Sequence, residues 1–271
     1  LNNDGLKRIE TRLMTRMKGE WYGYSYEWNP EQTDAVLVDA AGRDREILVR
    51  DQAADSGQRR QTWHYPSRAE CMVCHSRAEN FVLGLSVQQT NMNVTVNGET
   101  MPQLERFKQL GLFHNTAVKG DHETATANTE KPFAFPSAVH QMPRLANPAD
   151  KTQPLETRVR SYLHSNCANC HVKEGGGNSP VTMAFGRPLE KTGLMNAIPI
   201  HGSFDLTDAK LIKPSDPRAS ILLHRIRIRG RGQMPPLATS VVDREAVEMI
   251  TRWINKMPAE NPSAAPEKDP N

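Results

Sequence analysis

The sequence predicts a mainly α-helical fold with a small β-rich N-terminal part and long loops. Apolar residues recur at helical spacing just before Cys167 and again after Asp243, which favours helices in the second half of the chain. Residues 21–28 alternate aromatic with small or polar residues, the period of a half-buried strand. The four cysteines fall into two separate Cys-x-x-Cys pairs, so we expect two structural units.

Composition excludes several classes of protein. Of the 271 residues, 37% are apolar and 24% are charged, which is typical of a globular chain rather than a disordered one. No run of about 18 apolar residues occurs, so the sequence predicts no membrane span. The net charge of +3 is too small to favour binding to nucleic acid.

A histidine directly follows each cysteine pair, in the segments Cys71–His75 and Cys167–His171. The pattern Cys-x-x-Cys-His attaches c-type haem, because both thiols form thioethers with the haem vinyl groups and the histidine binds the iron. We therefore expect two covalently attached haem c groups. Their predicted attachment residues are Cys71, Cys74, Cys167 and Cys170, and their predicted iron ligands are His75 and His171.

Three other uses of these cysteines fit less well. A zinc ribbon would place its second pair about 15–20 residues after the first, whereas Cys74 and Cys167 lie much further apart. A thioredoxin-like pair requires a βαβ context and no histidine. A disulfide between cysteines three residues apart is strained. Because haem c is attached outside the bacterial cytoplasm, we expect an exported bacterial protein, periplasmic or extracellular.

Residues 1–64 are predicted to form a β-rich N-terminal segment. The aromatic face of the strand at 21–28 is expected to be packed rather than to bind sugar. Two further runs, Ala35–Val38 and Glu46–Val49, flank a predicted hairpin turn. Residues 65–150 are predicted to be the first haem c unit with a wrapping loop.

Two helices are expected in that first unit. Ser67 and Glu70 match a capping box, which predicts that a helix begins there and carries Cys71 in its first turns. A second helix is expected from Met101 or Pro102 to Leu110.

Residues 151–257 are predicted to be a second cytochrome unit, and residues 258–271 a flexible proline-rich tail. The last helix is expected to begin at Asp243. One face of that helix carries Ala246, Ile250, Trp253 and Met257, and one face of the helix before Cys167 carries Leu155, Val159, Tyr162 and Leu163.

A low-spin haem needs a sixth ligand, and three methionines occur in Met-Pro-x-Leu segments: Met101, Met142 and Met234. Met234 is predicted to bind the second haem, because the prolines after it stiffen its loop; the alternative is a methionine that fills a packing gap. For the first haem, Met101 and Met142 remain equal candidates. His64, His114, His140 and an open site are further alternatives.

Arginines alternate with isoleucines from Arg225 to Arg229. An extended segment would place the arginines on one face, where Arg225 and Arg229 are predicted to pair with haem propionates. The alternative is a solvated charged face.

Residues 155–257 resemble a class I cytochrome c. The segments that carry this resemblance are Cys167–His171, Met234-Pro235-Pro236 and the predicted helix with Trp253-Ile254. That resemblance implies His171/Met234 ligation. The whole chain resembles a di-haem c-type cytochrome region of large secreted bacterial proteins, which in some members lies beside a quinoprotein sugar-dehydrogenase-like propeller. The matching segments are 21–24, 65–71, 82–85, 158–171 and 229–237.

The resemblance implies two cytochrome c-like haem units that transfer electrons, as a domain of a larger redox protein. A dehydrogenase domain is the expected donor, and a cytochrome or an oxidase pathway the expected acceptor. No side chain is predicted to be catalytic. The alternative is a di-haem cytochrome c peroxidase-like enzyme, which needs an open haem site and acid–base residues. A third hypothesis is that the chain is a docking module, in which residues 1–64 bind carbohydrate or a partner domain.

Overall fold

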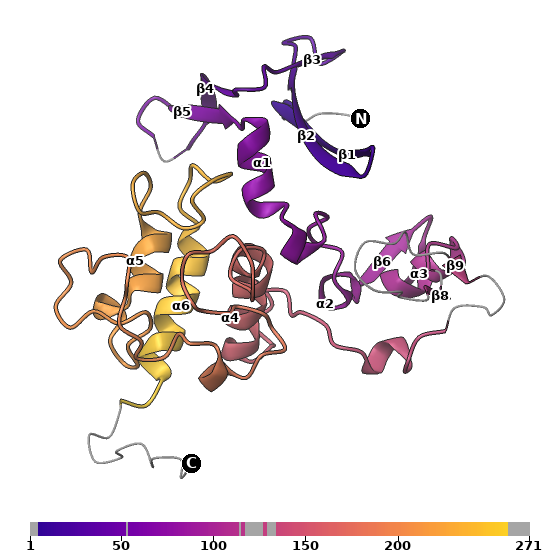
Figure 1. Cartoon of the computed structure of the whole chain (residues 1–271). Helices are drawn as coiled ribbons and strands as arrows, with labels where there is room; N and C mark the ends of the chain where they lie inside the picture. The colour runs from indigo at the N-terminus through magenta and orange to yellow at the C-terminus, as the bar shows by residue number, and fades with distance from the viewer. Residues whose placement is uncertain (1–4, 53, 114, 117–126, 129–133, 260–271) are drawn as a thin grey trace. The chain divides into compact units, whose positions relative to one another are not determined.

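The computed structural model describes residues 5–52, 54–113, 115–116, 127–128 and 134–259 (Figure 1). The chain divides into two compact units. The first unit comprises Leu1–Leu83 and Tyr162–Asn271, and the second comprises Gly84–Ser161. Both Cys-x-x-Cys-His segments belong to the first unit. From residue 260 onward, the predicted proline-rich tail lies outside the described residues.

The prediction of a mainly α-helical fold with two cytochrome c-like units is wrong. Helices cover 27% and strands 21% of the described chain, the strands form small antiparallel sheets, and no haem-binding fold is evident among these residues. One reason is that the helices are short. The helix at the first motif ends at Cys74, and Asn80 and Phe81 follow with positive φ, which an α-helix cannot accommodate. The β-rich N-terminal part is present as expected.

The first sheet has the strand order β1-β2-β3. Its strands are Glu10–Met17, Glu20–Trp28 and Ala35–Leu37. Lys18 and Gly19 both have positive φ, at 51° and 87°, so they form the tight type of turn that fits the twist of an antiparallel hairpin. The period-two prediction for 21–28 is therefore confirmed.

The buried face of β2 is the opposite of the predicted one. Gly23 and Ser25 are buried, whereas Tyr22 is exposed and Tyr24 and Tyr26 are half-buried. The reason is that helix α1 (Arg68–Cys74) packs against β2 and needs small side chains beneath it. Tyr24 contacts the first residue of this helix, because the guanidinium of Arg68 lies 4.7 Å from the centre of the Tyr24 ring.

The second sheet pairs β4 (Arg43–Arg50) with β5 (Gln58–Tyr65). The predicted hairpin between 35–38 and 46–49 is therefore wrong, because the first run pairs with β2 and the second with β5. Gly42 lies in the connection between the two sheets and has a φ of 71°. A Cβ there would lie 2.5 Å from the carbonyl oxygen of Tyr65, a contact that only glycine avoids.

The rest of the described first unit consists of long loops with short 3₁₀ turns, the end of one α-helix and two whole α-helices. Tyr162 and Leu163 end α4 (Leu155–Leu163), and a π-helical turn over His164–Ala168 continues it. Two further helices, α5 (Ile221–Arg227) and α6 (Arg244–Lys256), pack together. Asp243 caps α6, accepting a 3.0 Å hydrogen bond from the amide of Ala246, as predicted.

Helix α6 supplies much of the apolar core. Its buried side chains are Ala246, Met249, Ile250, Trp253 and Ile254, so three of the four residues of the predicted face are buried. Met257 is the exception, because the helix ends at this residue. Ile212, Ile221 and Leu223 complete this core from the loops and from α5.

The second unit is small. Its hairpin consists of β6 (Asn93–Val96) and β7 (Glu99–Pro102), turned by Asn97-Gly98, both with positive φ. Around this hairpin, the chain forms α2 (Val87–Thr90), α3 (Gln103–Gln109), a single turn over Val139–Gln141 and the short pair β8 (Asn115–Thr116) and β9 (Ala127–Asn128). The helix predicted from 101 or 102 to Leu110 is α3, shorter by one or two residues at its start and by one at its end.

Among the described residues, no helix combines the length and the apolar character that crossing a bilayer requires.

Gly42→Ala should destabilise the chain strongly. Placing a Cβ at positive φ costs about 1–2 kcal/mol, and overpacking adds about 1–3 kcal/mol more. Gly57 is the matched control: its φ of 67° is similar, but nothing lies within 4 Å of its Cβ position. Urea unfolding should show a loss in Gly42→Ala that clearly exceeds the loss in Gly57→Ala. Equal losses would contradict the contact at Tyr65.

His64 should make the stability of the chain depend on pH. Its Nδ1 lies 2.6 Å from Asp44 and its Nε2 3.1 Å from Glu70, and the hydrogen bond to Asp44 is the main cause that raises the pKa of His64. The stabilisation is complete below the ordinary histidine pKa of about 6.5 and is lost as pH rises through the higher folded-state pKa. His64→Gln should remove this loss from melting curves recorded across that range; an unchanged pH profile would contradict the prediction.

Candidate functional site

The first motif is carried by helix α1, whose start is fixed by a capping box. The Ser67 hydroxyl accepts a hydrogen bond from the Glu70 amide at 3.2 Å, and Glu70 accepts one from the Ser67 amide at 2.8 Å, as predicted. Cys71 lies in the first turn of the helix and Cys74 is its last residue. Residues three apart lie on the same side of a helix, so both thiols point to one side.

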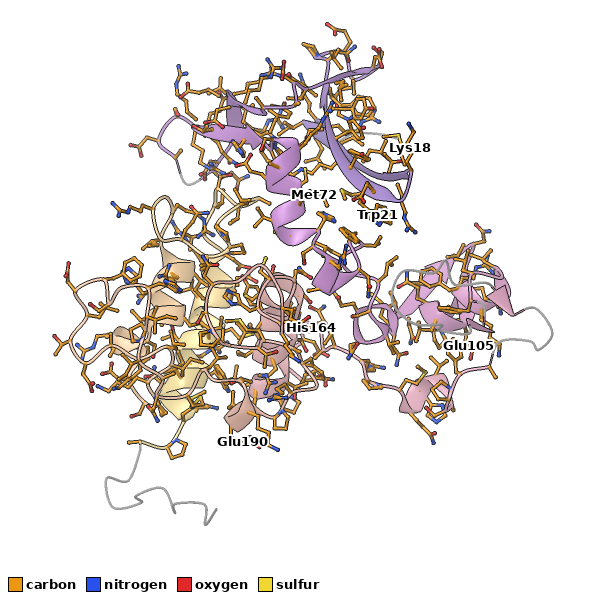
Figure 2. The ribbon with its side chains drawn as sticks, viewed as in Figure 1. Lys18, Trp21, Met72, Glu105, His164 and Glu190 are labelled. Atoms are coloured by element: carbon orange, nitrogen blue, oxygen red, sulfur yellow. The ribbon has the colours of Figure 1, made fainter. Side chains whose placement is uncertain are left out.

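His75 follows directly, and its ring is oriented by the backbone. Its Nδ1 donates to the carbonyl oxygen of Phe81 at 2.6 Å, which leaves Nε2 as the nitrogen with the lone pair. A metal-binding histidine usually has this arrangement, with the second nitrogen held by a carbonyl or carboxylate. Phe81 is itself held by stacking on Trp21 of β2, with ring centroids 6.0 Å apart; Figure 2 labels Trp21 and also Met72 of α1.

The second motif begins in the π-helical turn after α4. Here Cys167 accepts hydrogen bonds from the amides of Cys170 and His171, at 3.1 and 2.9 Å. The Nδ1 atom of His171 is buried and has no hydrogen-bond partner among the described residues. Burial, with a smaller effect of Arg225, lowers the pKa of His171, so the ring is held in the neutral form that metals bind.

The cysteine thiols differ in acidity. All four lie among the described residues and none forms a disulfide. Burial raises the pKa of Cys167 to about 12 and also raises the pKa of Cys71. A hydrogen bond from Cys170 instead lowers the pKa of Cys74 to about 7. Cys74 is therefore the more nucleophilic cysteine of the first motif at neutral pH.

The two motifs meet in space, which the predicted division into separate units did not anticipate. The Sγ atoms of Cys74 and Cys170 lie 3.8 Å apart, and the Sγ of Cys170 lies 3.9 Å from the carbonyl oxygen of Val73. Gly176 lies against the same carbonyl, where a Cβ would come within 2.8 Å of the oxygen. Two segments almost a hundred residues apart in sequence thus form one cluster.

A cavity of about 570 Å³ adjoins this cluster. The first motif contributes Cys71, Cys74 and His75 to its wall, and the residues around the second motif contribute Tyr162, Ser165, Asn166 and Asn169. Met234 and Arg229 line the cavity as well. A cavity of similar volume, about 590 Å³, lies among residues 213–218 of the same unit and includes none of the predicted site residues.

Met234 therefore shares a cavity with the first motif. Its amide donates a 3.0 Å hydrogen bond to the carbonyl of Arg225, which anchors its loop to α5. His171 is not among the residues that line this cavity. The assignment of Met234 to the second haem stays a prediction.

The candidate sixth ligands of the first haem are distributed over both units. Met101 lies in strand β7, paired with Val94, and Met142 follows a 3₁₀ turn, with its carbonyl accepting a bond from Asn91. Both methionines belong to the second unit, as does His140, whereas His75 belongs to the first. His114 lies outside the described residues. The choice between the methionines stays open.

His64 is the candidate ligand that the structure disfavours. Both of its ring nitrogens are engaged by carboxylates, Nδ1 by Asp44 and Nε2 by Glu70. Binding iron would require it to give up one of these bonds.

The predicted extended arginine segment is wrong, because Arg225 and Arg227 lie in helix α5. Arg225 donates to the carbonyls of Gly232 and His201, both at 2.9 Å. Arg229 donates to the carbonyls of Ile226, Ile228 and Val241 and to the hydroxyl of Thr239. Its Nε is buried and has no partner among the described residues, so one donor remains for an anion such as a propionate.

These observations fit a c-type haem at the first motif. The cavity brings together two thiols, an oriented imidazole and an arginine with an unpaired donor. The second motif shows only part of this set, a buried neutral imidazole and two thiols. Within the described chain, no group of three or more His, Cys, Asp or Glu side chains is arranged to hold a bare metal ion.

Gly23 is a site residue that motif analysis missed. A Cβ at this position would lie 2.7 Å from Cβ and 2.8 Å from Sγ of Cys71. Glycine inside a strand often marks the close approach of another group, and this signal was present in the sequence.

Comparison with known protein families, with curated proteins and with solved structures finds no match for this chain.

Gly23→Ala should hinder thioether formation at Cys71. The added methyl group takes the space beside the Cys71 sulfur, while Cys74 keeps its surroundings. Mass spectrometry of the purified chain should then show haem at the first motif held mostly by one thioether instead of two. Gly186→Ala is the control, because nothing lies within 4 Å of that Cβ position. Normal double attachment in Gly23→Ala would show that the contact does not restrict this site.

Proposed function

We propose that the chain is a di-haem c-type cytochrome that transfers electrons outside the cytoplasm. The observation that carries the proposal is the pair of Cys-x-x-Cys-His motifs, the first of which lines a cavity together with residues around the second. When bound, haem supplies one-electron oxidation and reduction at iron. The chain's own residues attach the haem, orient the iron ligands and limit the access of water.

Each of these roles has support in the described contacts. The Phe81 carbonyl fixes the orientation of the His75 ring, and burial keeps His171 neutral and able to bind iron. Arg229 has a buried donor for a propionate. Arg225 and Arg229 also hold the loops on either side of Met234 through backbone carbonyls, which limits how far a weakly bound thioether can move.

Met234 is proposed as the sixth ligand of the second haem and Met101 or Met142 as that of the first. Thioether ligation raises the potential of a haem, so such centres suit an electron acceptor for a dehydrogenase. A dehydrogenase domain, on the same polypeptide or a separate one, is the proposed donor. A cytochrome or an oxidase pathway is the proposed acceptor.

The peroxidase-like alternative has one observation in its favour: His64 and Glu70 also line the cavity beside Cys71 and His75. A peroxidase needs an acid–base group above an open haem. However, both ring nitrogens of His64 are already held by carboxylates, Nδ1 by Asp44 and Nε2 by Glu70. His64 would have to give up one of these bonds to move a proton above a haem, so electron transfer is the function that the site supports better.

The proposal predicts two haem groups on each chain secreted by a bacterial host that attaches haem c. Mass spectrometry and the pyridine haemochrome assay should give two haems for the wild type and one for the variant Cys71→Ser/Cys74→Ser. A chain secreted by such a host without haem would overturn the proposal.

Met234→Ala should convert one of the two haems from low-spin to high-spin, seen by visible and EPR spectroscopy. Met17→Ala is the matched control, because Met17 is an exposed residue of β1. Two low-spin haems in Met234→Ala would show that Met234 is not a ligand. A high-spin haem in the wild type that reacts with peroxide would favour the peroxidase-like alternative.

A further inference from the structure

The contact between the motifs is built by a run of three glycines after the second motif, Gly175–Gly177. A Cβ at Gly175 would lie 2.4 Å from the carbonyl oxygen of Cys170, and a Cβ at Gly177 would lie 2.9 Å from the same oxygen. The backbone therefore folds back tightly on its own motif. Between these two residues, Gly176 lies against the carbonyl of Val73 in the first motif.

This fold-back brings particular cysteines together. Cys170 and Cys74, the second cysteines of their motifs, have Sγ atoms 3.8 Å apart, which is van der Waals contact for two sulfurs. The first cysteines have other neighbours: Cys71 is covered by Gly23 of β2, and Cys167 lies in the π-helical turn. The two attachment sites therefore meet at one defined pair of thiols.

We propose that the chain holds its two haems edge to edge at Cys74 and Cys170, as one coupled pair rather than two independent centres. The inference rests on the proposed function. A thioether joins each sulfur directly to a carbon on the edge of a haem ring, so sulfurs in contact bring two ring edges together. An electron that crosses between them oxidises one iron and reduces the other, with no bond made or broken and no proton moved.

A coupled pair of haems would suit a particular kind of electron donor. Two haems held edge to edge in this way could accept two electrons in quick succession, one at each iron. This capacity fits a donor that oxidises its substrate by two electrons, the class of reaction that dehydrogenases perform. Oxidation of the substrate by two electrons is then balanced by reduction of both irons from ferric to ferrous.

The experiment compares the fully oxidised and the half-reduced holoprotein by pulsed EPR, after haem content has been measured. Low-spin ferrous haem is diamagnetic, so the half-reduced protein shows each ferric haem alone. In a coupled pair, the ferric signal of the fully oxidised protein should relax several-fold faster and show dipolar splitting. Two haems per chain with identical relaxation in both states would overturn the pairing. A chain without haem would instead overturn the proposed function.

A matched pair of glycine variants tests the contact itself. Gly176→Val should push the motifs apart, because its side chain meets the Val73 backbone, and the enhancement of relaxation should weaken. Gly186→Val should leave it unchanged, since nothing lies within 4 Å of that position and its φ is not positive. Equal enhancement in both variants would overturn the role of Gly176, and the wild-type comparison remains decisive if Gly176→Val does not fold.

Discussion

The close approach of two backbone segments, Gly176 on the carbonyl of Val73, is the constraint on which the site depends. It joins the helix that carries the first motif to the chain just after the second, and it is possible because residue 176 is a glycine, with no side chain to meet that carbonyl. Beside this contact, the Sγ of Cys170 lies 3.9 Å from the same carbonyl and 3.8 Å from the Sγ of Cys74, which also lines the cavity. A hydrophobic core is present, but it lies mainly between α5 and α6.

Local features of this chain could be predicted from sequence because they depend on neighbouring residues. The capping box at Ser67, the cap at Asp243 and the strand at 20–28 each follow from side chains within a few positions of one another. The motifs themselves are short and specific. For these elements, hydrophobic periodicity and helix-capping residues were sufficient to predict where the strand and the helices begin.

The non-local features could not be predicted in the same way. Which face of β2 is buried depends on α1, which comes some forty residues later and needs the small side chains of Gly23 and Ser25. β3 pairs with β2 rather than with β4, and between β3 and β4 the chain turns at Gly42 against the carbonyl of Tyr65, a residue more than twenty positions later. The mainly α-helical expectation failed because the helices are short: α1 ends at Cys74, and Asn80 and Phe81 beyond it have positive φ.

The contact between β2 and Cys71 bears on the order in which the parts of this chain fold. Gly23 lies against the Cys71 side chain, so residues nearly fifty positions apart in the sequence meet at this contact. The hairpin of β1 and β2 is closed by its own neighbouring residues, Lys18 and Gly19, and needs nothing from α1 to form. The hairpin can therefore fold first, and α1 completes the contact when it packs against β2.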